Sequence, residues 1–238
     1  GFEKPDNPFN KKQVREAVSL ALDRRTMSQA EEGGLSNFTG NWIPDDWPGA
    51  IEAPEPEFNL QRAQQLMAEA GFPNGFEVDA LTPLPPYFSL GERVVTAIRE
   101  IGIRTRLQTM ERGAFLSKLG EGPEAFSGIV LNVSAAPGDA ASRVRALAIC
   151  GGSSSRTCVP EIDEPFKRYE ASTNPQEREQ LLRQVQQYMI DNYTFVSIYR
   201  AAFINAQGPK VLNKWDEIIG AVPQYVYIGP YEDIQVRE

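Results

Sequence analysis

Gly75-Phe-Glu-Val-Asp-Ala-Leu-Thr82 alternates apolar and polar side chains, which is the period of two typical of a half-buried strand. Proline lacks a backbone donor, so the next segment, Pro83-Leu-Pro-Pro-Tyr-Phe88, must leave the sheet. Ser89 and Glu92 then match a capping box, and apolar residues recur at helical spacing until Gly102 ends the helix. The stretch therefore predicts a strand, a loop and a helix in that order.

Two further strands are predicted downstream of this helix. Ile103-Arg-Thr-Arg-Leu-Gln-Thr-Met110 follows at once, and Phe126-Ser-Gly-Ile-Val-Leu-Asn-Val133 is apolar enough for burial on both faces. A strand, a crossover helix and a second strand imply a parallel pair with a right-handed connection. We therefore expect an α/β fold with a central, mostly parallel sheet flanked by helices. Ligands of such sheets lie outside the carboxyl ends of the strands, so Thr82 to Phe88 and Asn132 to Asp139 are candidate walls of one cleft.

Five residues of these two loops are candidate ligand contacts. Tyr87 and Asn132 are the leading contacts, and Val133, Ser134 and Asp139 extend the second wall. Tyr87 could equally be a packing residue of the core. Asp139 could equally be the N-cap of the helix that follows, because aspartate is a favoured cap. The sequence leaves both pairs of alternatives open.

A long segment from Gly33 to Phe58 holds no helical or strand period and is interrupted by glycines and prolines. Loops of this length are usually functional or disordered, and the two tryptophans, Trp42 and Trp47, disfavour disorder. Either these tryptophans cover the core or they contact a ligand. Trp42 is therefore counted as a further candidate contact.

Composition narrows the function classes. The 238 residues are 41% hydrophobic, which is enough to close a core, and the net charge of -8 with no basic block argues against nucleic acid. No apolar run approaches the roughly 20 residues that span a bilayer. The chain has no histidine, which removes the commonest general base and the commonest metal ligand. We expect neither an enzyme nor a metal site, and no cofactor.

Cys150 and Cys158 flank the flexible segment Gly-Gly-Ser-Ser-Ser-Arg-Thr, which can bring the two thiols together. A zinc site would need further soft ligands. A disulfide is the favoured interpretation, and two unpaired buried thiols are the alternative. If the bridge forms, the protein belongs in an oxidising compartment and is exported.

The remaining pattern predicts helices and two late strands. Asn10 is expected to cap the first helix with Gln13 at the capping-box position. The basic residues of that region, Lys11, Arg15 and Arg24, are expected to form a solvated face. Phe195-Val-Ser-Ile-Tyr199 and Ala202-Phe-Ile-Asn205 are predicted strands, and an aromatic-rich tail begins at Lys210.

Several segments together resemble the family 5 extracellular solute-binding proteins of ABC importers, a group of oligopeptide-, dipeptide-, opine- and nickel-binding receptors. The matching segments, in order, are Pro8 to Arg24, Phe58 to Phe76, Glu100-Ile-Gly-Ile103, Pro160-Glu-Ile-Asp163 and Tyr231-Glu-Asp-Ile234. Such receptors are about twice this length, and two lobes close on the ligand about a hinge. The resemblance implies a periplasmic-binding-protein-like lobe.

On this resemblance, residues 1–209 would be the second, ligand-binding lobe. Residues 210–238 would be a carboxyl-terminal tail that returns towards a first lobe, which is missing here together with its signal peptide. The expected partners are a small polar solute, the ABC permease subunits and the missing lobe, with no nucleic acid. A monomer in the periplasm is expected.

One departure from the family pattern concerns the ligand. Peptide-binding members carry Gly-Trp and a nearby Asp-Tyr after the third strand, and the acid pairs with the peptide's amino group. Here the first pair falls on Asn132 and Val133, and the second on Ala136 and Pro137. A buried ammonium without a carboxylate partner is strongly unfavourable. The resemblance thus implies that a free peptide N-terminus is a poor ligand unless Asp139 substitutes.

Three functions compete. The first is the solute-binding component of an ABC uptake transporter, which captures a peptide-like or other small polar solute for a membrane permease. The second is a ligand-sensing domain of a signalling protein with the same fold. The third is a small hydrolase, for which no pair of carboxylates stands out. The expected export favours the first.

Overall fold

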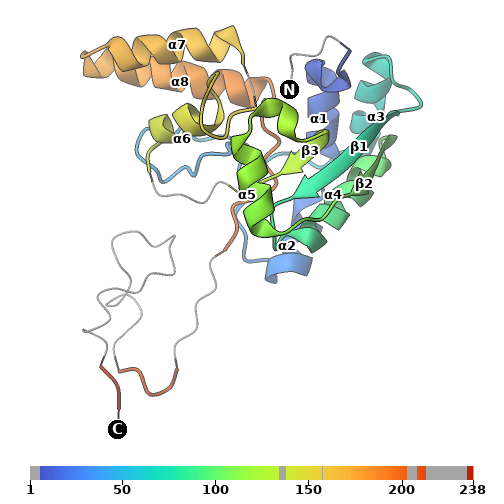
Figure 1. Ribbon diagram of the computed structural model, residues 1–238, viewed down its shortest axis with the longest axis horizontal. Helices are drawn as coiled ribbons and strands as arrows, with labels where there is room; N and C mark the ends of the chain where they lie inside the picture. The colour runs from blue at the N-terminus through green and yellow to red at the C-terminus, as the bar shows by residue number, and fades with distance from the viewer. Residues whose placement is uncertain (1–5, 134–137, 157, 203–207, 213–234, 238) are drawn as a thin grey trace.

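The computed structural model describes residues 6–133, 138–156, 158–202, 208–212 and 235–237 of the chain (Figure 1). The α-helices in this part are α1 (Lys12–Ala21), α2 (Arg24–Glu32), α3 (Leu60–Glu69), α4 (Phe88–Arg99), α5 (Arg112–Gly120), α6 (Ala140–Leu147), α7 (Pro160–Ala171) and α8 (Pro175–Asp191). Two short 3-10 helices are η1 (Pro8–Asn10) and η2 (Pro123–Ala125). The strands are β1 (Phe76–Pro83), β2 (Ile103–Leu107) and β3 (Gly128–Leu131).

The described strands form one parallel sheet in the order β2-β1-β3. β1 pairs with β2 from Phe76 opposite Ile103 onward, and it pairs with β3 up to Pro83 opposite Leu131. The predicted parallel unit of β1, α4 and β2 is therefore confirmed. The prediction that β3 is buried on both faces is wrong, because only Leu131 is buried and Gly128 is exposed. The reason is that β3 lies at the edge of the described sheet and packs chiefly on β1, so no described helix packs closely on both of its faces.

The first side of the molecule, here called the sheet side, consists of β1–β3 and α1–α4. α1 packs on α3, and α4 packs on β1 and β2. Their apolar faces share one core, whose fully buried members include Val14, Ala63, Leu81, Ile98 and Ile103. The predicted central sheet with flanking helices is thus the observed arrangement.

A close approach of two glycines closes this side. Gly75 has φ +70° and Gly102 has φ +84°. A Cβ added at Gly75 would lie 1.8 Å from the carbonyl oxygen of Gly102. The turn before β1 and the turn before β2 can lie this close only because neither residue has a side chain.

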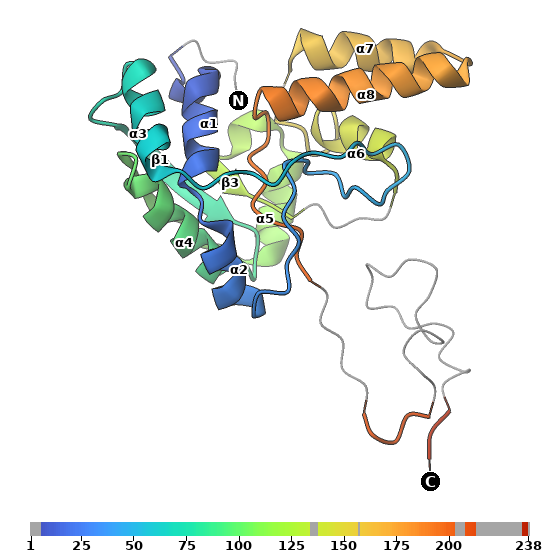
Figure 2. The same cartoon turned by 180° about the vertical axis from the view of Figure 1, so that it is seen from behind.

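The second side, here called the helical side, consists of α6, α7, α8 and the loop of residues 37–51. Figure 2 shows α7 and α8 as an antiparallel pair beside α6, with the loop running past α6. The buried residues of this second core include Ile43, Val144, Ile162, Phe166 and Val185. A third, smaller cluster of Leu84, Phe115, Leu119 and Phe126 lies under α5.

A buried glutamine of α8 holds the loop to the helical side. Gln186 has no exposed surface, and its Oε1 accepts from Asn41 Nδ2 at 3.3 Å and from the Ile51 amide at 3.2 Å. Its Nε2 donates to the carbonyl oxygens of Gly49 at 2.8 Å and Leu182 at 3.3 Å. Every polar atom of this side chain is therefore bonded, as burial requires.

Two predicted helix caps are wrong. Asn10 ends η1, whose cap is Asn7, and α1 begins after Lys11 with no side-chain cap. Ser89 lies inside α4, which begins after Tyr87, also without a side-chain cap. In both places a turn precedes the helix and shifts its start away from the best capping residue.

The prediction that Lys11, Arg15 and Arg24 form a solvated face is wrong for Arg24. It is 3% exposed and begins α2, a helix that the sequence did not indicate. Its guanidinium donates to Ser197 O from Nε at 3.0 Å and from Nη2 at 2.8 Å. It also donates to Ser19 O at 2.8 Å, Ser19 Oγ at 2.9 Å and Leu22 O at 3.2 Å. Burial lowers the pKa of Arg24 to about 10, so it remains charged at neutral pH.

Residues 195–199 do not form the predicted strand. They run without a ladder, and the adjoining Arg200 makes one isolated bridge with Asn37. The physical reason is that Arg24 occupies the Ser197 carbonyl, and no strand of the described part lies alongside to pair with the rest. Of the other predicted strand, only Ala202 lies among the described residues.

Candidate functional site

The two predicted walls begin at the same edge of the sheet. β1 and β3 end side by side, and the Leu84 amide donates to Leu131 O at 2.8 Å. The carboxyl ends of parallel strands meet here, which is where ligands of open α/β sheets lie. The predicted juxtaposition is confirmed for residues 82–88 and for the start of the second wall at residues 132–133. We call this region the carboxyl edge.

Tyr87 lies at this edge and also packs against the core. It is half-buried, it contacts both the first and the third apolar cluster, and its amide donates to Leu84 O at 2.9 Å. Its hydroxyl makes no hydrogen bond to another described residue. The ring is thereby held in place while the hydroxyl is available as a donor or acceptor.

The second wall is only partly described. Asn132 is exposed, and its Oδ1 accepts from the Val133 amide at 2.9 Å. Val133 is half-buried against the third cluster. Ser134 lies outside the described residues. The described part of this wall therefore offers one amide group and one apolar side chain to a ligand.

Asp139 is the N-cap of α6. Its Oδ1 accepts from the Ser142 amide at 2.7 Å, and Ser142 Oγ accepts in turn from the Asp139 amide at 3.1 Å. This reciprocal capping box confirms the capping alternative. One oxygen of the Asp139 carboxylate is therefore engaged at the start of α6.

Trp42 belongs to the helical side. Its ring lies 4.8 Å from that of Phe195, and it packs against the second core. Its Nε1 is buried without a hydrogen-bond partner among the described residues. Trp42 thus contacts a different cluster from Tyr87, and the structure does not bring these two predicted contacts together.

A polar cluster at the carboxyl edge was not predicted. Glu31 at the end of α2 accepts from Ser89 Oγ at 2.6 Å and pairs with Arg93 Nε, which joins α2 to the first turns of α4. Burial opposes ionisation of Glu31, but the hydrogen bonds from Arg93 and Ser89 outweigh it and lower its pKa. Burial raises the pKa of Tyr199, and the charges of Glu32 and Glu31 raise it further. The phenol is therefore a hydrogen-bond donor at neutral pH.

The sequence alone indicates that only two residues of this cluster lie together. Ser89 and Arg93 lie four residues apart, so they share a face of α4, but Glu31 lies on the helix that the sequence did not indicate. Tyr199 comes from a segment predicted as a strand. These side chains meet only through long-range packing.

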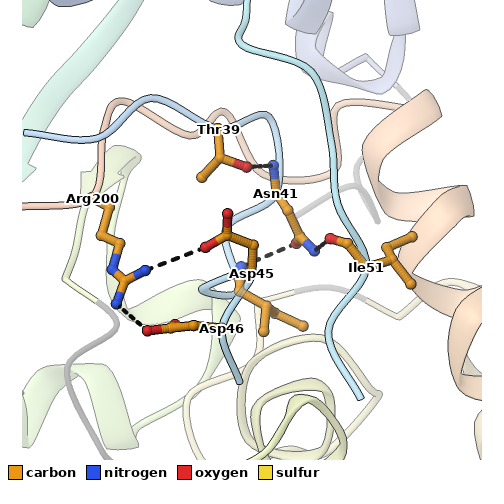
Figure 3. A network of polar contacts seen from close by, with 7 residues as sticks. Thr39, Asn41, Asp45, Asp46, Ile51 and Arg200 are labelled. Atoms are coloured by element: carbon orange, nitrogen blue, oxygen red, sulfur yellow. Dashed lines mark hydrogen bonds and ion pairs between the residues drawn. The ribbon is translucent and has the colours of Figure 1, made fainter. Parts of the chain in front are cut away.

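Residues 195–202 leave the sheet side after α8 and are here called the exit segment. Figure 3 shows how Arg200 of this segment is bonded to the loop of residues 37–51. Arg200 Nη1 lies 3.3 Å from Asp45 Oδ1, and its Nη2 lies 2.7 Å from Asp46 Oδ2. Within the loop, Asn41 accepts from the Ile43 amide at 3.0 Å and donates to Ile51 O at 2.9 Å. These bonds connect the helical side to the segment that leaves the sheet side.

The predicted disulfide is present. Cys150 and Cys158 are bonded, with their Cα atoms 4.4 Å apart. Among the described residues, Asp163 is the third metal-ligand type of side chain near them, and it accepts from the Cys150 amide at 2.8 Å. The bridge therefore joins the end of α6 to the start of α7.

No helix in the described part of the chain is both long and apolar enough to cross a membrane. The chain belongs to the bacterial extracellular solute-binding proteins, family 5, whose model matches residues 1–155.

Relatives and solved structures agree with this family. The chain is 26% identical to heme-binding protein A of Haemophilus influenzae, over 88% of this chain and 40% of that protein. The structure of HbpA2 from Haemophilus parasuis matches with a TM-score of 0.68 at 25% identity, over 81% of this chain and 39% of that one.

The dipeptide-binding protein of Pseudoalteromonas sp. SM9913, solved in complex with Met-Leu, matches with a TM-score of 0.67 at 23% identity. That match covers 80% of this chain and 39% of the other, and at this identity it shows the fold alone. The chain thus spans about two fifths of the length of these three proteins. Two of the three, the Haemophilus influenzae and Pseudoalteromonas proteins, are named as binding proteins.

Proposed function

We propose that this chain is the ligand-binding second lobe of a periplasmic receptor that delivers a small polar solute to an ABC permease. The observation that carries the proposal is the carboxyl edge, where β1 and β3 end side by side beneath Tyr87 and Asn132. Residues 1–209 would supply one wall of the cleft, and the tail of residues 210–238 would run towards the other lobe. The family membership supports this over the signalling alternative and the hydrolase alternative.

The solute would contact this wall through uncharged groups. Asp139 is occupied as a helix cap, and Glu31 is paired with Arg93. Of the predicted contacts at the edge, Tyr87 offers a phenol and Asn132 an amide, whereas these two carboxylates already accept hydrogen bonds. A peptide-like solute with a blocked amino end fits this wall better than a free dipeptide.

The test is isothermal titration calorimetry of this chain, and of the whole natural protein containing it, with Met-Leu, N-acetyl-Met-Leu and hemin. The relatives' names motivate these probes. We expect the acetylated peptide to bind the whole protein at least about tenfold more tightly than Met-Leu, a difference of about 1.4 kcal/mol. If half of a binding energy near -8 kcal/mol resides on this wall, the chain alone is left at about millimolar affinity.

Variants of the whole protein test the wall itself. Tyr87→Phe combined with Asn132→Ala should weaken binding of the best probe about tenfold, because on this proposal both removed groups contact the solute. Tyr188→Phe on α8 is the matched control and should bind as the parent does. Equal affinity in all three proteins would contradict the assignment of the wall. Absence of any solute in the purified protein by native mass spectrometry, with no probe bound, would contradict the receptor function.

A further inference from the structure

The helical side contains a hollow that is unrelated to the carboxyl edge. It has a volume of about 890 Å³ and lies between residues 49–51 and the turn joining α7 to α8. Sites for small organic ligands are of roughly this size, about 300–1,000 Å³. The buried side chains of Ile51 and Leu182 supply its apolar lining. None of the sheet residues or predicted contact residues lines it.

One guanidinium in this hollow is held in a fixed position. Arg178 Nη1 donates to Tyr169 O at 2.7 Å and to Ser172 O at 3.2 Å, the carbonyls at the end of α7. The guanidinium also lies 4.0 Å from the centre of the Tyr169 ring, whose centre is 5.3 Å from that of Phe166. A planar donor fixed by two carbonyls and a ring keeps its remaining N–H groups in one orientation.

The other lining charges are already paired. Glu170 pairs with Arg145 at 2.7 Å, and Glu179 lies 3.9 Å from Arg183. Within the described part of the chain, no carboxylate bonds to Arg178. The hollow therefore combines a cation that lacks an anionic partner in this part with an apolar lining, and this combination suits a carboxylate attached to an apolar group.

We propose that this hollow binds small amphiphilic carboxylic acids. The carboxylate accepts from the free N–H groups of Arg178, and the apolar part of the acid packs on Leu182 and Ile51. The site is separate from the proposed solute cleft and does not depend on the function of that cleft.

The test is titration of the ¹⁵N-labelled chain with sodium benzoate, with benzamide and acetate as matched probes, followed by amide chemical shifts. Benzoate should shift the amides of residues 49–51 and 172–183 and should bind with a dissociation constant of about 1 mM. Benzamide lacks the charge and acetate lacks the ring, so each should bind at least about tenfold more weakly. Equal binding of benzoate and benzamide, or benzoate shifts confined to other regions, would overturn the proposal.

Two kinds of substitution distinguish a loss of benzoate binding from a loss of stability of the α7–α8 pair. Arg178→Gln should weaken benzoate binding at least about tenfold, whereas Arg183→Gln, which removes a rim charge, should change it less than about threefold. Because Arg178 also bonds to the end of α7, a second variant, Thr173→Trp, fills the mouth of the hollow from an exposed position and leaves Arg178 intact. Unchanged benzoate binding in this tryptophan variant would also overturn the proposal.

Discussion

The sheet side and the helical side of this protein are held together by different means. The sheet side is closed mainly by the apolar side chains of one core and by the backbone pairing of its strands. The helical side depends on a loop of residues 37–51, which is irregular and is fixed by the amide of Gln186 on α8. Apolar packing tolerates small adjustments, but a buried polar side chain requires all of its partners at once. The two sides should therefore respond differently to single substitutions.

The largest effect is expected where backbones touch on the sheet side. Gly75→Ala places a Cβ 1.8 Å from the Gly102 carbonyl oxygen and adds strain at φ +70°. We expect the free energy of unfolding to fall by about 3–5 kcal/mol, measured by urea denaturation. Gly151→Ala is the matched control, because Gly151 has φ +78° but no atom within 4 Å of the added Cβ. It should cost only about 1 kcal/mol. Similar losses in both variants would show that φ, and not the close approach, sets the cost.

The second effect concerns the bond between the sheet side and the exit segment. Arg24→Met removes five hydrogen bonds and leaves the Ser197 and Ser19 carbonyls without these donors. A loss of about 3–4 kcal/mol is expected, with faster hydrogen exchange in residues 195–200. Arg25→Met removes only an exposed ion pair with Glu55 and should change stability by less than about 0.5 kcal/mol. If Arg25→Met lowered the free energy of unfolding as much as Arg24→Met does, the hydrogen bonds of Arg24 would not be the cause of the loss.

The third prediction concerns the contribution of the buried Gln186 amide to the stability of the helical side. Gln186→Leu keeps the volume but leaves the Ile51 amide and the Gly49 carbonyl without their partner. Stability should fall by about 2–3 kcal/mol, and exchange should rise in residues 41–51 but not in β1. Gln187→Leu is the control on the next residue, which is exposed and bonds only to Asp191, so its effect should lie within about 0.5 kcal/mol. A uniform rise in exchange over both sides would contradict their independent response.

The features that could be predicted from sequence are those encoded within a few residues. The strand period at Phe76 and the helix cap at Asp139 depend on near neighbours, and both are present. The parallel pairing followed from the order of elements. The edge residue Tyr87 was found because it follows a strand and two prolines.

The features that could not be predicted depend on contacts between distant residues. Arg24 has the same local pattern as an exposed helix residue, and only its bond to Ser197, 173 positions away, reveals that it is buried. Residues 195–199 have the composition of a strand, but a strand needs a neighbour that composition does not reveal. The cluster of Glu31 and Tyr199 at the carboxyl edge was missed for the same reason.

The smallest effect concerns that cluster and its dependence on pH. The pKa of Glu31 is lowered in the folded protein, because the hydrogen bonds from Arg93 and Ser89 outweigh the effect of burial. A carboxyl group whose folded pKa is depressed stabilises the protein above its unfolded pKa of about 4.3, and this contribution disappears as the pH falls through the folded pKa. Glu31→Gln should therefore cost about 0.5–1 kcal/mol at pH 7, and the difference from the parent should shrink progressively below about pH 4.5.

Urea denaturation of both proteins from pH 3.5 to pH 7 measures this difference. Glu92→Gln on the same helix is the control, because Glu92 is exposed and its side chain has no bonded partner among the described residues. It should show no comparable pH-dependent difference. A stability gap for Glu31→Gln that stays constant across the pH range would mean that the side chain acts through its shape alone. A gap that closes on acidification would mean that the charge of Glu31 joins α2 to α4 at the carboxyl edge, where the sheet side would meet its solute.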